Sequence, residues 1–257
     1  MRSPARLTAL LLGLIALSAI AQPAAAPSAS ATPTGHHAST PPTPIWVHLT
    51  AAHLRAVLPP PPAPGSLADI ADLDVVLLLQ AVRTPEDEAE ANADAPRGAV
   101  DWAAGALGTA FDPACQIEAV RLLETLHNDL RTANRAANAA WGERPRPAKA
   151  DARVRPSLPN AVDGPGYPSA RTAATRVFAS VLAEIYPERR EHLLAAAERS
   201  AMLRLIGGSH YPTDIAGGRY TAALFLQRLA DVPAYRDALG AARAERQRCG
   251  ASPSDTP

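Results

Sequence analysis

Apolar side chains recur every three to four positions along most of the chain after Ile45, which is the period of an amphipathic helix. Helix start and stop signals agree with this period. Ser66 and Thr84 are suitable N-cap residues, and Gly142 and Gly207 are suitable stops. No stretch shows the strict alternation that is typical of strands. The pattern therefore predicts an all-α fold.

Two connectors interrupt the predicted helices. The stretch "LPPPPAPGS", 58–66, predicts an extended segment, and the Pro-, Arg- and Gly-rich stretch 143–167 predicts a loop. A loop of that length inside a compact domain is often functional. We expect one helical bundle of six to eight helices, without internal repeats. The predicted helices cover about 47–57, 66–83, a segment starting at Thr84, then Asp112–Trp141, 169–186, 187–207, 213–229 and 233–248.

The first 21 residues have the features of an export signal. Arg2 and Arg6 precede "LTALLLGLIALSAIA", an apolar stretch that is short for a membrane span. Ala19-Ile20-Ala21 suits a signal peptidase, so the mature chain would begin near Gln22. We expect export to an oxidising compartment such as the periplasm. An uncleaved anchor is the alternative.

Residues 22–44 are small, polar and rich in proline, which predicts a disordered linker. His36 and His37 lie in it and are expected to be solvated rather than metal-bound. The helical domain would then cover 45–250. No later stretch is apolar and long enough for a membrane span, so none is expected after signal cleavage.

Composition narrows the choice of function. Apolar residues make up 47% of the chain and aromatic residues only 4%, which favours packed helices over a β sandwich. The net charge is zero, so we expect no nucleic-acid partner. Lys149 is the only lysine. Cys115 and Cys249 could form a disulfide in an oxidising compartment or stay free, and no metal-binding spacing is present.

The stretch "RLIGGSHYPTDIAGGR" carries the strongest chemical signal. Arg204 ends one predicted helix, two glycines turn the chain, and His210 follows, with Asp214 in the first turn of the next helix. Asp214 could accept one imidazole N–H and leave the other ring nitrogen to act as a nucleophile or base. A helix corner with a surface ion pair is the alternative.

Two further stretches suit an oxyanion. "GYPSARTA" places Ser169 and the N–H groups of Ala170 and Arg171 at a helix start, where free donors and the helix dipole favour an anion. "WGERPRP" holds Arg144 and Arg146 in a loop stiffened by proline. Alone, each fits an ordinary N-cap or a solvated basic loop. Together with the third stretch they predict a phosphoryl-transfer pocket without a metal.

The order Arg-Pro, then Pro-Ser, then Arg-x5-His-x3-Asp resembles the three-part signature of a phosphatase superfamily. This superfamily joins type 2 phosphatidic acid phosphatases, bacterial class A nonspecific acid phosphatases and vanadium haloperoxidases. The surroundings of the motifs look most like the class A enzymes. The resemblance implies a helical bundle with the site between helices. It also implies a phosphohistidine at His210, orientation by Asp214, and phosphoryl binding by Arg146, Arg204, Ser169 and the amide of Ala170.

The chain departs from that signature at two positions. The family has a lysine seven residues before its Arg-Pro arginine, and counting back from Arg146 gives Ala139. Arg135, one helical turn earlier, or Arg144 could replace its charge. The family also has a histidine as general acid where this chain has Arg171. An arginine cannot donate that proton, because its pKa lies above about 12, but Arg171 could help to bind phosphate.

The motifs and their departures lead to two hypotheses. The first is an exported acid phosphatase that hydrolyses small phosphate monoesters without a metal or cofactor, with weakened turnover. The second is a non-catalytic relative that binds phosphate or a phosphorylated ligand. Vanadate could occupy the same site, but a vanadate-dependent oxidant is the least favoured hypothesis for the function. His127 and His192 lie far from the three motifs in sequence and are expected to be packing or surface residues.

Overall fold

Every regular element in the described part of the chain is a helix, which confirms the all-α prediction. The computed structural model describes residues 43–95, 97–142, 144–158 and 161–250, so the predicted export signal and linker residues 22–42 lie outside the described residues. The α-helices are α1 (Ala51–Val57), α2 (Leu67–Val82), α3 (Pro85–Asp94), α4 (Ala99–Leu107), α5 (Ile117–Trp141), α6 (Pro147–Ala150), α7 (Ala170–Ile185), α8 (Arg190–Ile206), α9 (Pro212–Ala230) and α10 (Pro233–Gly250). Two 3-10 turns, η1 (Gly108–Ala110) and η2 (Pro187–Arg189), precede α5 and α8.

Eight of these ten α-helices match the predicted segments, and α4 and α6 are additional. Helix α6 is a single turn that begins at Pro147, inside the stretch predicted to be a loop. Helix α4 follows the Asp94–Gly98 connector and buries Trp102 and Leu107 in the core. Both are short, so tertiary packing rather than a long apolar period stabilises them.

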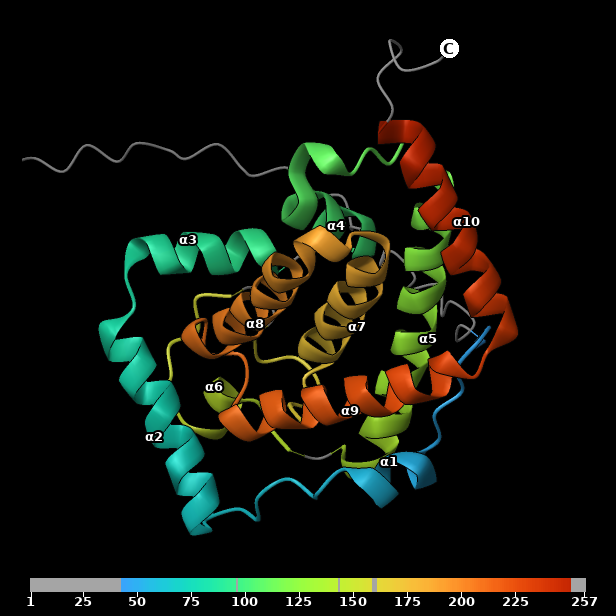
Figure 1. Cartoon of the computed structure of the whole chain (residues 1–257). Coiled ribbons are helices and arrows are strands. Elements are labelled where there is room, and N and C mark those ends of the chain that lie inside the picture. The colour runs from blue at the N-terminus through green and yellow to red at the C-terminus, as the bar shows by residue number, and fades with distance from the viewer. Residues whose placement is uncertain (1–42, 96, 143, 159–160, 251–257) are drawn as a thin grey trace, which may run out of the picture. The chain divides into compact units, whose positions relative to one another are not determined.

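Helix α7 is the central element of the bundle. Helices α8, α9, α5 and α4 all pack against it, and Figure 1 shows it enclosed by them. Phe178 on α7 and Phe225 on α9 are buried in the main apolar core with Leu126 of α5. The N-cap of α7, Ser169, is fully buried, so the start of this helix is held firmly against its neighbours.

The helix caps agree with the sequence pattern. Ser66 caps α2 by accepting the N–H of Asp69 at 3.3 Å. Thr84 and Asp87 form a reciprocal capping box at the start of α3, with Pro85 in its first turn. These local signals are visible in the sequence because each satisfies backbone donors within one helical turn.

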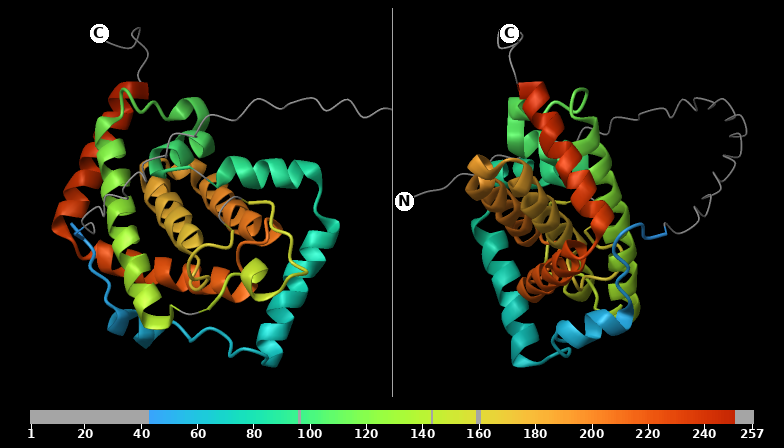
Figure 2. Two further views of the ribbon diagram at one scale, coloured as in Figure 1. Left: turned by 180° about the vertical axis from the view of Figure 1, so that it is seen from behind. Right: turned by 45° about the vertical axis from the view of Figure 1, so that its right-hand side comes forward.

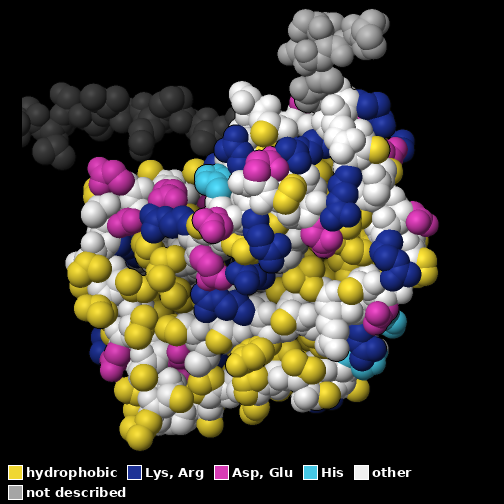
Figure 3. Space-filling view, in the orientation of Figure 1, with side chains coloured by type: hydrophobic (Ala, Val, Ile, Leu, Met, Phe, Trp, Pro, Cys, Tyr) yellow, Lys and Arg dark blue, Asp and Glu magenta, His cyan; other side chains and the backbone are white. Residues whose placement is uncertain are grey.

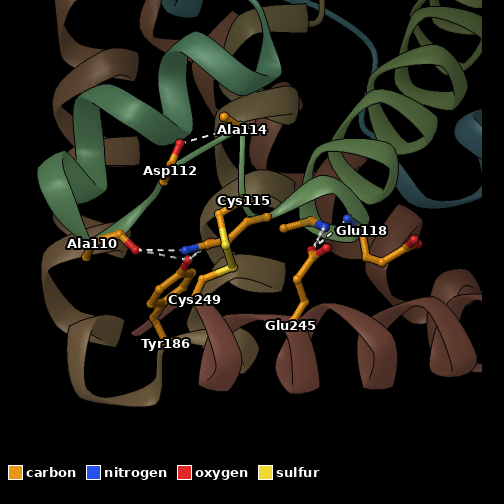
Figure 4. Close-up of a disulfide and its surroundings, with 10 residues drawn as sticks. Ala110, Asp112, Ala114, Cys115, Glu118, Tyr186, Glu245 and Cys249 are labelled. Atoms are coloured by element: carbon orange, nitrogen blue, oxygen red, sulfur yellow. Dashed lines mark hydrogen bonds between the residues drawn. A yellow bond between two sulfur atoms is a disulfide. The ribbon is translucent and has the colours of Figure 1, made fainter. Parts of the chain in front are cut away.

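The predicted start of α5 at Asp112 is wrong. Asp112 instead accepts the N–H of Ala114 in a turn, and the helix begins at Ile117. Its free N–H groups are satisfied from another helix. The carboxylate of Glu245 on α10 accepts the N–H of Glu118 at 2.7 Å (Figure 4). A residue that is distant in sequence therefore caps α5, and the sequence around Ile117 contains no signal that predicts this cap.

A disulfide joins the same two helices. Cys115, just before α5, is bonded to Cys249 near the end of α10, as Figure 4 shows. Figure 2 shows α10 lying along α5. The sequence left this pairing open, and the structure decides it. At the middle of α5, buried Asp129 accepts the N–H groups of Ile45, Trp46 and Val47 and so fixes the segment before α1.

The surface carries one apolar stripe. Leu67, Ile70, Val75, Leu78 and Val82 of α2 are exposed, and apolar side chains gather over this helix in Figure 3. Within the described residues, no helix combines the length and the apolar character needed to cross a membrane.

The disulfide is expected to contribute strongly to stability. It closes a loop with a sequence separation of 134 residues, so replacing both cysteines in Cys115→Ser/Cys249→Ser should lower the free energy of unfolding by about 2–5 kcal/mol. Urea unfolding of the oxidised proteins measures this. Reductant should lower the wild-type stability to that of the variant and leave the variant unchanged. Equal stability of the oxidised wild type and the variant would contradict the prediction.

Candidate functional site

The turn between α8 and α9 carries His210 into the protein interior. Gly208 adopts a φ of 70°, which L side chains rarely tolerate, and reverses the chain after α8. The N–H groups of Ser209 and His210 then donate to the carbonyl of Arg204 at 3.0 and 3.3 Å. Only 4% of His210 is exposed. The turn is therefore a buried, ordered structure rather than a surface helix corner.

Asp214 orients the imidazole of His210. The Nδ1 atom of His210 lies 3.3 Å from Oδ2 of Asp214, and the same oxygen accepts the N–H of Tyr211 at 2.9 Å. A carboxylate only accepts hydrogen bonds, so this contact places the ring proton on Nδ1. The lone pair of a neutral His210 is then at Nε2, which is the atom that a nucleophilic role requires.

Arg146 faces that lone pair. Its Nη1 atom lies 3.0 Å from Nε2 of His210 and donates to the carbonyl of Ser209 at 2.9 Å. Its Nε donates to the carbonyl of Asp163 at 2.7 Å. The structure thus brings the first and third motifs, 64 residues apart, together at the imidazole. An oxyanion placed beside Nε2 would contact a guanidinium that is already held in position.

Burial lowers the pKa of His210, and Asp214 opposes this shift, while Arg146 and Arg204 add to it. The ring therefore becomes charged only at a lower pH than an ordinary histidine, which favours its neutral form at neutral pH. Burial likewise lowers the pKa of Arg204 to about 10, although Asp94 opposes it. Arg204 is still a cation at neutral pH. The site thus combines a neutral imidazole with fixed positive charges.

The second motif is tied to the third through the backbone. Ser169 is the N-cap of α7, and its N–H donates to the carbonyl of Asp214 at 2.9 Å. Its hydroxyl accepts the N–H of Thr172, so it is engaged within α7. Ala170 begins α7, where an N–H group has no intrahelical acceptor. Gly218 lets α9 approach the start of α7 closely, because a Cβ at this position would lie only 2.6 Å from the carbonyl oxygen of Ser169.

Arg171 is held in place by an acidic residue of α3. Its Nε donates to Oδ2 of Asp94 at 3.3 Å, and its Nη atoms donate to the backbone carbonyls of Arg97 and Asp94. Oδ2 of Asp94 also accepts Ser200 Oγ at 2.7 Å and lies 3.5 Å from Arg204 Nη2. Asp94 therefore balances the charge of Arg171.

Arg204 retains an unused donor. Its Nη2 contacts the carbonyl of Ala91 at 3.2 Å and Asp94, but its buried Nε has no partner among the described residues. Buried donors are rarely left unsatisfied in native proteins, and each exception calls for an explanation such as a missing ligand. A phosphate oxygen would satisfy this one.

Arg144 has a different set of partners from the one expected of a phosphate ligand. Its Nη1 donates to Oδ1 of Asp214 at 2.9 Å, and its Nη2 donates to Asp72 at 2.7 Å and Asp69 at 3.1 Å. The guanidinium also lies 4.1 Å from the ring centre of Tyr211. Burial disfavours its charged form, but Asp214, Asp72 and Asp69 together raise its pKa. Arg144 thus holds the carboxylate that holds His210.

The expected lysine position lies near the C-terminus of α5. The arginine that contacts it comes from α1, where Arg55 donates to the carbonyls of Ala139 and Ala140 at 3.5 and 3.3 Å. Arg135 lies one turn earlier on the exposed side of α5, and its role as an auxiliary cation stays a prediction. His192, predicted to be a packing or surface residue, contacts the carbonyl of Ala106 at 2.8 Å.

Sequence reasoning missed the acidic residues around the site. Asp69 and Asp72 on α2 and Asp94 on α3 lie far from the motifs along the chain, and no motif spacing connects them to an arginine. Their function depends on the packing of α2 and α3 against α8 and α9, which the pattern of apolar residues does not specify. Among the described residues, no three His, Cys, Asp or Glu side chains are grouped so as to hold a metal ion.

Curated proteins with related sequences are named as acid phosphatases. A non-specific acid phosphatase of Providencia stuartii is 27% identical over 228 residues, covering 84% of this chain and 90% of that protein. Non-specific acid phosphatases of Salmonella typhimurium and Salmonella typhi are 37% and 35% identical over 79 residues. These two matches span 31% of this chain and only 32% of the length of those relatives. No family model matches the chain. The chain is thus similar in sequence to non-specific acid phosphatases, along most of its length in one case and over a part of it in the others.

Arg144 is expected to be essential to the stability of the site. In Arg144→Met, Asp72 and Asp214 would stay buried without their cation, which should cost about 3–5 kcal/mol of unfolding free energy. Urea unfolding gives the value. Arg228→Met is the matched control, because Arg228 is an exposed residue of α9 and its loss should change stability by less than about 0.5 kcal/mol. Equal effects of the two substitutions would contradict this role.

Proposed function

We propose that the protein is an exported acid phosphatase that hydrolyses small phosphate monoesters through a phosphohistidine at Nε2 of His210. The observation that carries the proposal is the state of this imidazole. Asp214 holds its Nδ1, and Nε2 faces the guanidinium of Arg146. The similarity to non-specific acid phosphatases agrees with this chemistry. The disulfide agrees with export to an oxidising compartment.

The geometry suits a two-step displacement. Nε2 of His210 would attack phosphorus while the ester oxygen leaves, and water would then cleave the phosphohistidine. Charge on the ring would be stabilised by Asp214, whose other oxygen is held by Arg144. The phosphoryl oxygens would take donors from Arg146, the free Nε of Arg204 and the N-terminus of α7. No step in this scheme requires a metal or cofactor.

Protonation of the leaving oxygen is the weak step. Arg171 cannot donate a proton, and its guanidinium is held by Asp94 and backbone carbonyls. Absence of a general acid typically costs about 10²–10⁴ in rate. The cost should be largest for alkyl phosphates and smallest for esters of good leaving groups. We therefore expect turnover of p-nitrophenyl phosphate to exceed that of alkyl phosphates by a wide margin.

The direct test uses p-nitrophenyl phosphate and His210→Ala. Wild type should hydrolyse the ester at acid to neutral pH and give an acid-labile phosphoenzyme on rapid quenching, whereas His210→Ala should do neither. His192→Ala is the control, since His192 lies outside the site and should leave both readouts unchanged. Equal rates for wild type and His210→Ala would overturn the proposal.

The alternative is a non-catalytic relative that binds phosphate or a phosphorylated ligand. Arg171 favours it, because this residue adds a fixed cation in place of an acid. Calorimetry with phosphate or vanadate separates the two functions. Binding without hydrolysis by the wild type would support the alternative, and absence of both would rule it out.

The replacement of the general acid can be reversed. Arg171→His alone would remove one of the two cations that pair with Asp94. The informative variant is therefore Asp94→Asn/Arg171→His, and Asp94→Asn is its control. Relative to the control, hydrolysis of alkyl phosphates should rise by about 10²–10⁴, with little change for p-nitrophenyl phosphate. Steady-state rates for the two substrates give the answer. Equal gains for both, or none, would show that proton donation does not limit the enzyme.

A further inference from the structure

A cavity of about 160 Å³ lies between α5 and the first turn of α7. Its size corresponds to roughly five water molecules at about 30 Å³ each, which suits one small oxyanion with a short stem. The lining residues are His127, Leu130, Arg131, Asn134, Ala170, Arg171 and Ala174.

The cavity wall is basic and carries hydrogen-bond donors. His127, Arg131 and Asn134 recur at the spacing of one face of α5, so their side chains converge on the same space. No acidic residue is among those that line it. Arg131 is exposed and forms no ion pair within the described part of the chain. Its charge is available to a ligand, unlike that of Arg171, which Asp94 balances.

The titration of His127 reflects the same positive field. Burial lowers the pKa of His127, and the charges of Arg131 and Arg171 lower it further. Its ring lies edge-on to Phe178, with 6.0 Å between ring centres, which limits its rotation. A bound anion would relieve the repulsion between these cations, whereas a neutral ligand would not.

The cavity adjoins the proposed phosphoryl site through two shared residues. Ala170 and Arg171 line the cavity and are also the first residues of α7, capped by Ser169. Ser169 donates its N–H to the carbonyl of Asp214, the residue that orients His210. A ligand held at the start of α7 could thus extend from the imidazole side into the cavity.

We propose that this cavity binds a second anionic group, a phosphate or a carboxylate, of a substrate whose phosphoryl group lies at His210. The inference rests on the proposed function and narrows its substrate class to phosphate esters with a second acidic group. Arg131 and His127 are the specificity-determining residues. They contact the second anion and take no part in cleaving the ester bond.

The kinetic test compares three substrates. Phosphoglycolate carries a carboxylate, ethanediol bisphosphate carries a second phosphate, and p-nitrophenyl phosphate carries neither. For phosphoglycolate or ethanediol bisphosphate, whichever the cavity accepts, Arg131→Gln should lower kcat/KM about tenfold, because one charged hydrogen bond is lost. The kcat/KM for p-nitrophenyl phosphate should stay unchanged. Arg228→Gln, which removes an exposed arginine of α9, should change none of them. Equal losses for all three substrates, or no loss, would overturn the inference.

A binding test does not depend on hydrolysis. In His210→Ala, the ring signals of His127 should shift on addition of inorganic phosphate or acetate, and Arg131→Gln in that background should weaken binding about tenfold. The ring signals of His127 are identified as those that disappear in His127→Gln. A shift with phosphate, acetate or both would support the anion site and show which group it accepts, even if the wild type proves inactive. No shift with either anion would overturn the site, even if the wild type is an active phosphatase.

Discussion

The buried carboxylate of Asp214 is the group on which the site depends. One oxygen accepts from Arg144, the other accepts from Tyr211 and contacts His210, and its backbone carbonyl accepts from Ser169. A buried charge is costly unless it is paired and hydrogen-bonded, and here every partner comes from a segment that carries a motif. The same residue therefore orients the imidazole of His210 and connects three distant stretches of chain.

A second carboxylate, Asp94, balances the other side of the site. It lies beside Arg171 and Arg204 and accepts from Ser200, so these two arginines share one anion. This arrangement gives a physical account of how the positive charge of Arg171 is tolerated at the start of α7, because helix α3 supplies the compensating charge.

The position of α7 explains why the chemistry gathers where it does. Its N-terminus lies at Asp214 and shares one wall with the basic cavity beside α5. Helices α8 and α9 pack along it and present the turn that carries His210. Because α7 is enclosed by its neighbours, free N–H groups at its start keep their direction without a ligand, which is the preorganisation that oxyanion stabilisation requires.

Local chemistry in the sequence determined most of the helices, the caps at Ser66 and Thr84, and the meeting of the Arg146 and His210 motifs. These features depend on spacing within one helical turn or on a motif order that resembles the signature of known phosphatases. The start of α5, the helix α4, the disulfide and the roles of Asp72 and Asp94 were decided only by tertiary structure. Each depends on a partner from a distant helix, and the pattern of apolar positions shows which face of a helix is buried but not which charged residue will lie opposite it.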